Sequence, residues 1–321
     1  GYKNGKGGRG DLVAEVKYRL NNLDIDSIIS SGQLEQLIED NSKCSLPQML
    51  STERPDKAAN HLLSGRVVVI VNGSPYVLIM PCVFVDFLSS AEDPNLKFQY
   101  ANLLKFVRLV AFFITLLLPG LYVAITNFHQ EIIPTELLFA IVASRESVPF
   151  PIIVEILAME ISFELIREAS LRVPSPIGTT IGIIGALILG QAAVEASIVS
   201  PILIIIVAIT GITSFAIPDF YLSFHLRIVR FLYIIAGFLA GFLGIGIVLF
   251  SHLVLLCSLK SFGVSYLAPF VPATSKNNKA YFMPPFWNRE KRPDFLNTKR
   301  PQKEARISMK WKYKIGGNNG N

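Results

Sequence analysis

Long apolar stretches dominate the middle of the chain. Four of them carry no charged residue, at residues 109–125, 173–194, 196–217 and 231–259. An α-helix rises about 1.5 Å per residue, so about 20 apolar residues cross the hydrocarbon core of a bilayer. The pattern predicts an α-helical integral membrane protein, and we expect about four full spans within a membrane domain at residues 98–260.

The first hundred residues show an amphipathic pattern instead. Apolar residues recur at helical spacing over residues 11–20, where Asp11 is placed to cap the helix. Further helical turns are predicted at residues 24–29 and 33–38, and another helix from the Thr52 region to about Leu63.

The strongest hairpin signal follows these helices. Residues 65–71 and 76–80 are rich in β-branched and apolar side chains, and Asn72-Gly73-Ser74-Pro75 separates them as a turn. Two strands need another layer to bury their apolar face. We therefore predict an N-terminal soluble α/β domain over residues 11–97, preceded by a linker-like segment at residues 1–10.

Charged residues interrupt the apolar pattern at residues 134–172. On a helix, Glu160, Glu164, Arg167 and Glu168 would share one face. A span that faces lipid would not carry such a face, so the segment is predicted to be an amphipathic or re-entrant helix pair. Its candidate pore or ion-pathway residues are Glu155, Glu160 and Glu164.

Two more polar side chains end the second apolar run. Gln191 and Glu195 precede Pro201, and a carboxylate deep in a membrane costs about 2.5–3.5 kcal/mol on insertion scales. Both are candidates for the ion pathway. The alternative is that Glu195 lies near the surface and reaches the headgroups.

Small residues and one Pro-Gly pair mark the apolar runs. Four-residue spacing of small side chains allows helices to pack closely, and the candidate packing residues are Gly178, Gly182, Ala186, Gly190, Gly237 and Gly241. Pro119-Gly120 lies inside the first run, where such a pair kinks a helix without ending it. This pair is a candidate hinge.

The charge is distributed unevenly. Residues 271–321 hold twelve Lys and Arg against three acids, whereas the whole chain carries only +6. A basic cytoplasmic tail at residues 261–321 is predicted, attracted to anionic membrane lipids. Arg227 and Arg230 would then lie outside with four crossings; five crossings would reverse both sides. Nucleic-acid binding is disfavoured because no recognition motif accompanies the charge.

Sequence patterns for catalysis are missing. The three cysteines and four histidines are scattered, and no metal-ligand spacing, nucleophile elbow or phosphate loop is present. We expect no enzyme activity, cofactor or metal. Because the chain begins with Gly, we expect that an upstream part is missing.

Several stretches resemble the A subunit of bacterial spore germinant receptors, the GerA family, including its branch of the stage V AF type. The resemblance covers roughly residues 11–270. Its motifs are STERPD at 51–56, LLPGLYVA at 117–124, FHQEIIPTELL at 128–138, SRESVPFP at 144–151, GALILGQAAV at 185–194, SFAIP at 214–218 and LKSFGVSYL at 259–267.

The resemblance implies a multi-pass protein of the spore inner membrane. Its implied partners are a B-type transporter-like subunit, a C-type lipoprotein subunit and further copies of itself, together forming a ligand-gated cation channel that triggers germination. Two alternatives stay open: a non-conducting scaffold that transmits a conformational change, and an amplifying paralogue that works with the dipicolinate channel proteins.

Overall fold

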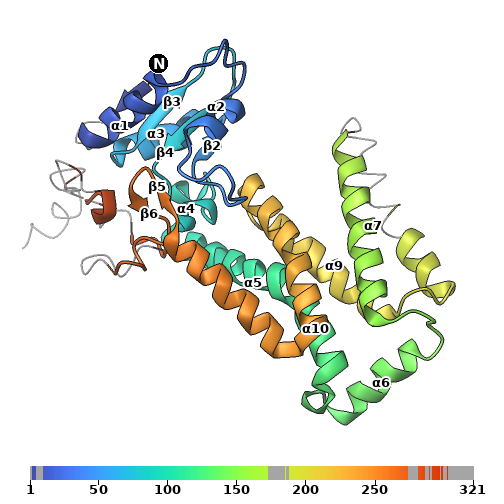
Figure 1. Cartoon of the computed structure of the whole chain (residues 1–321). Coiled ribbons are helices and arrows are strands. Elements are labelled where there is room, and N and C mark those ends of the chain that lie inside the picture. Colours follow the sequence, from blue (N-terminus) through green and yellow to red (C-terminus); the bar gives the residue numbers. More distant parts are fainter. Residues whose placement is uncertain are drawn as a thin grey trace, which may run out of the picture. The chain divides into compact units, whose positions relative to one another are not determined.

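The computed structural model describes residues 2–4, 10–172, 185, 188–273, 281–285, 289, 291–296, 298 and 302. Two units divide the chain. We call Gly1–Phe106 with Val254–Asn321 the sheet unit, and Val107–Leu253 the helical unit. Two helices, α5 (Phe98–Phe128) and α10 (Phe220–Ser258), run from one unit into the other (Figure 1).

The predicted hairpin is present in the sheet unit. Strands β3 (Val67–Ile70) and β4 (Val77–Met80) are antiparallel, with Val67 opposite Met80. Gly73 in the turn has φ of +85°, a conformation that glycine adopts without strain. Strand β2 (Leu50–Thr52) pairs with β4, and β1 (Tyr2–Asn4), inside the segment expected to be linker-like, pairs with β3. The order is β1-β3-β4-β2.

Helices cover this sheet as the amphipathic pattern predicts. They are α1 (Gly10–Asn21), α2 (Ser31–Ile38) and α3 (Pro55–Leu63); the short α4 (Phe84–Phe87) and the 3-10 turn η1 (Asp93–Asn95), which were not predicted, follow the sheet in the chain. The prediction of a helical turn at residues 24–29 is wrong, because this segment is irregular. Its Asp and Ser side chains compete with helical hydrogen bonds, and Ser30 caps α2 by accepting a bond from the Gln33 N–H.

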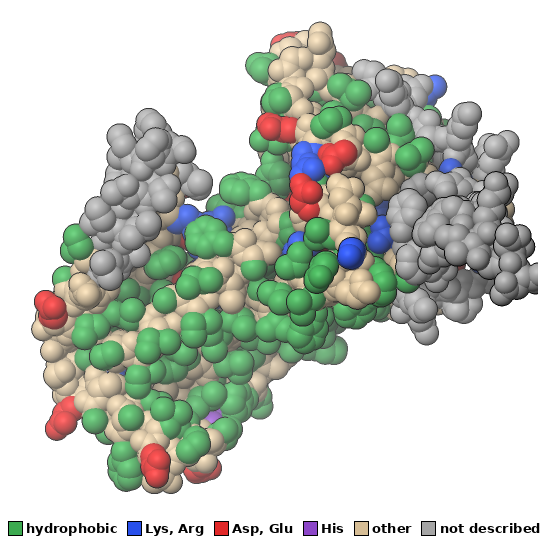
Figure 2. Space-filling view, turned by 180° about the vertical axis from the view of Figure 1, so that it is seen from behind, with side chains coloured by type: hydrophobic (Ala, Val, Ile, Leu, Met, Phe, Trp, Pro, Cys, Tyr) green, Lys and Arg blue, Asp and Glu red, His purple; other side chains and the backbone are tan. Residues whose placement is uncertain are grey.

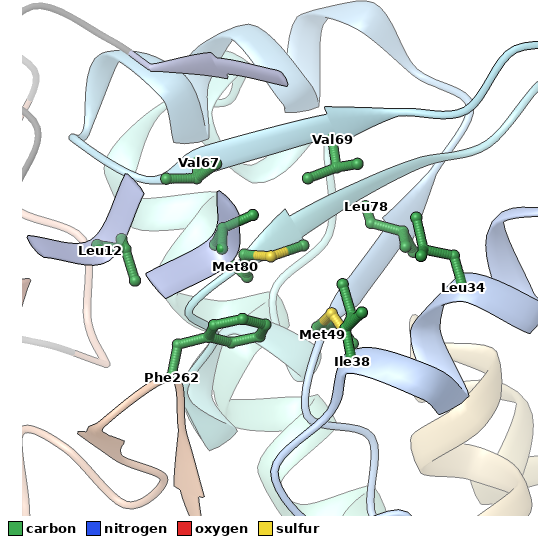
Figure 3. Close-up of a cluster of buried hydrophobic side chains, with 10 residues drawn as sticks. Leu12, Leu34, Ile38, Met49, Val67, Val69, Leu78, Met80 and Phe262 are labelled. Atoms are coloured by element: carbon green, nitrogen blue, oxygen red, sulfur yellow. The ribbon is translucent and has the colours of Figure 1, made fainter. Parts of the chain in front are cut away.

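The core of the sheet unit includes a side chain from far along the sequence. Phe262 is 6% exposed and packs among buried residues of the sheet and of α1 and α2 (Figure 3). It lies in the turn between β5 (Lys260–Ser261) and β6 (Val264–Ser265). Its φ of +48° is unusual for a bulky residue, and its N–H donates to Asp40 Oδ2 at 2.6 Å.

Part of the expected basic tail also packs on this unit. Tyr281 donates from its hydroxyl to the Lys105 carbonyl at 2.6 Å, and Lys105 Nζ donates back to the Tyr281 carbonyl at 2.9 Å. Asn102 makes a similar pair of hydrogen bonds with the Met283 backbone. The described residues near position 281 are therefore docked on the start of α5; the 3-10 turn η4 (Asp294–Leu296) lies further on.

The helical unit contains most of α5 and α10, together with η2 (Gln130–Ile132), α6 (Thr135–Arg145), α7 (Ile152–Arg172) and α9 (Pro201–Phe215). Residues of α5, α7, α9 and α10 share one apolar core. α6 and α7 occupy the segment predicted to form a helix pair. Most of the apolar run at 173–194 lies outside the described residues.

The last apolar run is not one straight helix. Ala240 and Gly241 inside α10 have non-helical dihedral angles, and Gly241 has φ of +58°. His225 and His252 nevertheless contact each other, with ring centroids 5.4 Å apart. In a straight helix these residues would be about 40 Å apart, so α10 folds back on itself at Gly241.

Candidate functional site

A row of charged side chains on α7 meets a row on α10. Its members, here called the charge ladder, are Glu160, Glu164, Arg167, Arg227 and Arg230. In its first rung, Arg230 Nη2 lies 2.6 Å from Glu160 Oε2, and the two side chains are 3% and 1% exposed. The rung is a buried ion pair within the helical unit.

The second rung is more accessible. Arg227 Nη1 contacts Glu164 Oε1, and the Glu164 side chain is 34% exposed. Arg167 Nη1 lies 3.8 Å from the other Glu164 oxygen, while its Nη2 donates to Ser214 Oγ at 2.8 Å. The Arg167 guanidinium also lies over the ring of Phe215, 4.4 Å from the centroid, which is cation–π geometry.

The first rung is not fully satisfied by hydrogen bonds. Glu160 Oε1 and Arg230 Nε are buried without a hydrogen-bond partner among the described residues. A buried ion pair loses its hydration, and its attraction repays that loss only with good geometry and further hydrogen bonds. This rung therefore fixes the position of α10 against α7 more than it adds net stability.

Glu155 has a different role one turn from the start of α7. It is buried, and its two carboxylate oxygens accept from Arg145 Nη2 at 3.1 Å and from the Ser200 N–H at 3.2 Å. Ser200 is the N-cap of α9. A carboxylate at this end of a helix is stabilised by the exposed N–H groups and the helix dipole, so Glu155 holds the first turn of α9.

The other candidate ion-pathway residues lie before α9. Gln191 and Glu195 are both exposed, in the helical stretch that precedes Ser200. The structure thus brings Glu160 and Glu164 together in the ladder and gives Glu155 separate partners. An exposed carboxylate near the start of α9 agrees with either role considered for Glu195, in an ion pathway or at the headgroups.

The candidate hinge lies in a close helix contact. α5 stays helical through Pro119. A Cβ atom added to Gly120 would lie 2.7 Å from the Tyr233 carbonyl oxygen of α10, and one added to Gly237 would lie 2.5 Å from the Gly120 carbonyl oxygen. The two backbones touch here, as small residues allow.

The remaining candidate packing residues differ in their surroundings. Gly190 is buried, with Ile204 in ordinary contact distance of an added Cβ, whereas Gly241 lies at the reversal of α10. A Cβ on Gly241 would also meet His129 at 2.8 Å. Gly178, Gly182 and Ala186 lie outside the described residues.

Sequence reasoning missed the partners of the acidic helix. From the sequence, Arg227 and Arg230 were interpreted only as charges that bear on topology. A usable signal was present, because glutamates at i, i+4 can face arginines at i, i+3 on a neighbouring antiparallel helix. Among the described residues, no group of three or more His, Cys, Asp or Glu is placed to hold a metal ion.

The fold and the site define the class of protein. It is a mainly α-helical protein with a small antiparallel sheet, and its helices α5 and α10 are long and apolar enough to cross a membrane. Hydrophobic side chains cover much of the surface seen in Figure 2. The sequence profile of the Bacillus/Clostridium GerA spore germination protein family matches residues 8–295. The chain belongs to this family, as its motifs suggested.

Curated relatives agree with this assignment. Spore germination protein KA of Bacillus subtilis (strain 168) is 50% identical over 287 residues, which are 89% of this chain and 53% of that protein. Spore germination protein GerLA of Bacillus cereus is 41% identical over 90% of this chain and 59% of its own length. The uncharacterized membrane protein YfkQ of Bacillus subtilis is 40% identical over 92% and 58%.

The chain thus spans somewhat more than half the length of these relatives. No solved structure matches it. The family is one of germination proteins and is not an enzyme family.

Proposed function

We propose that this chain is part of the A subunit of a nutrient-germinant receptor in the spore inner membrane. Membership of the GerA family is the observation that carries the proposal. A B-type transporter-like subunit and a C-type lipoprotein subunit are the proposed partners. Co-purification of both from spore membranes with the tagged full-length protein tests this, and their absence from a purification that retains the intact A protein would contradict it.

Membrane insertion is part of the proposal. The 31 residues of α5 would extend about 46 Å, more than the roughly 30 Å hydrocarbon core. Many large apolar side chains on α5, α9 and α10 are exposed, including Phe113, Ile212, Leu239, Leu243 and Phe250. Contact with lipid would remove this surface from water. Extraction of the protein by detergent but not by alkaline carbonate is the expected behaviour.

The A subunit is further proposed to oligomerise and to conduct cations when germinant binds. A carboxylate repeated around a ring of copies attracts cations, and Glu195 is exposed and available for such a ring. Glu160 and Glu164 are engaged by arginines, so we assign them to the control of the pathway. Glu155, held by Arg145 and Ser200, positions α9.

Flux measurements test conduction directly. Full-length protein in liposomes that contain the B and C subunits should release potassium on addition of germinant, and Glu195→Gln should reduce the release. Glu131→Gln, a change at an exposed position of η2, is the matched control. Glu195→Gln flux equal to that of the parent would remove Glu195 from the pathway.

A non-conducting scaffold is the second candidate, and the pairing of Glu160 with Arg230 favours it because that carboxylate is neutralised. The scaffold predicts no potassium release from such liposomes even though germinant changes the protease sensitivity of the A subunit. The amplifying paralogue differs in genetic context, where genes of dipicolinate channel proteins would replace those of B and C subunits.

A further inference from the structure

The face of α7 that carries the charge ladder has one more carboxylate, Glu168, which is not part of the ladder. Glu168 follows Glu164 by one turn of α7 and pairs with Arg172 at 2.7 Å on the same helix. These two side chains are 56% and 80% exposed, so their pair contributes little. Glu160, Glu164 and Glu168 thus form a row with four-residue spacing, and only the first two meet α10.

The arginines of α10 run in the opposite direction. Arg230 meets Glu160 and Arg227 meets Glu164, so rising numbers on α7 correspond to falling numbers on α10. A displacement of α10 by one turn toward the end of α7 would place Arg230 at Glu164 and Arg227 at Glu168. Two ion pairs would form again.

The opposite displacement would keep only one ion pair, between Arg227 and Glu160. It would place Arg230 beside Ile156, an apolar residue that is fully buried in the core of the helical unit. A buried guanidinium without a carboxylate is strongly unfavourable. Movement toward the end of α7 therefore keeps two ion pairs, whereas movement the other way keeps one.

The contact between α5 and α10 fits the same displacement. Gly237 now faces Gly120 backbone to backbone. Moving α10 by one turn would bring Gly241, four residues further on, to Gly120 instead, and glycine adds no Cβ to this contact. Helices that touch through small residues at four-residue spacing can pack in two registers, and one-turn shifts of packed elements are a known form of switching.

We propose that the ladder is a two-position switch in which α10 moves by one turn along α7. In the position observed here, Arg230 neutralises Glu160. In the second position Arg230 and Arg227 pair with Glu164 and Glu168, and Glu160 is left without an arginine, a cost that germinant binding would offset. The inference rests on the proposed cation-conducting function, because the position of α10 is what would open or close the pathway to which Glu195 is assigned.

Charge variants in spores that carry the full-length protein test the switch. Glu160→Gln removes a rung only from the observed position, so release of potassium without germinant should rise about tenfold, equivalent to about 1.4 kcal/mol. Adding Glu168→Gln should reverse the rise. Adding Arg172→Gln, the matched control, should leave the rise in place because it frees Glu168.

A substitution at an exposed residue tests the switch independently of whether the Glu160 variant folds. Glu168→Gln alone should leave the amount of A subunit unchanged and reduce potassium release in response to germinant, whereas Arg172→Gln should not reduce it. Potassium release by Glu160→Gln/Glu168→Gln equal to that of Glu160→Gln would overturn the switch, as would a normal response of Glu168→Gln.

A distance measurement separates the switch from conduction. Spin labels at Leu165 of α7 and Ile235 of α10, both exposed, report the register in purified full-length protein whose native cysteines are replaced by serine. Glu160→Gln should shorten the distance by up to the pitch of one turn, about 5.4 Å. An unchanged distance refutes the switch whatever the flux; a shortened distance without potassium release supports the switch and refutes conduction.

Discussion

Gly237 and Gly120 bring α10 and α5 into backbone contact, since a Cβ added to Gly237 would lie 2.5 Å from the Gly120 carbonyl oxygen. The contact lies in the LLPGLYVA motif, next to Pro119. Proline lacks an N–H, so the carbonyl four residues earlier loses its usual helical partner. The preceding turn of α5 contacts α9, where the Thr115 hydroxyl donates to the Thr213 hydroxyl at 2.9 Å. These two successive turns of α5 are therefore held by α9 and by α10.

The first prediction concerns this contact. Gly237→Ala should force the two helices apart and lower the thermal stability of the detergent-purified protein, at a cost of about 1–3 kcal/mol typical of overpacking. Gly246→Ala on the same helix is the control, since an added Cβ there meets nothing within 4 Å. That control should be neutral or mildly stabilising, because alanine favours helix more than glycine does.

The second prediction concerns the buried rung of the charge ladder. Arg230→Met leaves the Glu160 carboxylate buried without its partner, which typically costs about 3–5 kcal/mol. Glu160→Leu/Arg230→Met removes both charges and should recover most of the loss. Melting of the three proteins in one detergent measures this. Equal melting temperatures for Arg230→Met and the double variant would show that the pair is not buried as described.

Local patterns explain which parts of the fold were predictable. The β3–β4 hairpin depends on a turn sequence and two adjacent apolar runs, and α1 depends on a spacing within twelve residues. The turn sequence and the apolar spacing can each be recognised within a short stretch of consecutive residues. The helical turn expected at residues 24–29 failed for the same local reason, because polar side chains there favour irregular backbone.

Long-range contacts could not be predicted in this way. The place of Phe262 in the core of a sheet formed by residues 67–80 has no local signal, and neither does the pairing of Arg230 with Glu160. The reversal of α10 was hidden because the residues around Gly241 are as apolar as the helix arms. There, a glycine predicted to pack helices also provides a positive φ.

The third prediction concerns Phe262. Phe262→Ala should remove a buried ring from the core of the sheet unit, a type of change that costs about 3–5 kcal/mol. Faster hydrogen exchange in β3 and β4 of the full-length protein is the expected readout. Phe270→Ala is the control, because Phe270 is 56% exposed. Unchanged exchange in both variants would place Phe262 outside the core.

The last prediction concerns pH and two groups in the sheet unit with opposite effects. Burial, together with the charge of Arg66, lowers the pKa of His61 to about 3. The folded state therefore disfavours the proton that the unfolded chain binds near pH 6.5, and stability from this group is lost as pH falls from about 6.5 toward 3. Burial, together with Asp40, raises the pKa of Glu39 to about 7. Stability from Glu39 is present at low pH and is lost as pH rises from about 4.5 to 7.

Single substitutions separate the two groups. In His61→Gln only the effect of Glu39 remains, so the sheet unit should become less stable as pH rises from 4.5 to 7. Glu39→Gln leaves the His61 effect, and stability should rise over the same range. Asp86 does not interfere: burial opposes its ionisation, but the paired Arg66 holds the pKa of this carboxyl below its usual range. Hydrogen exchange of β3 and β4 at pH 5 and 7, corrected for the intrinsic exchange rate, measures both slopes; slopes of the same sign in the two variants would contradict the assignment.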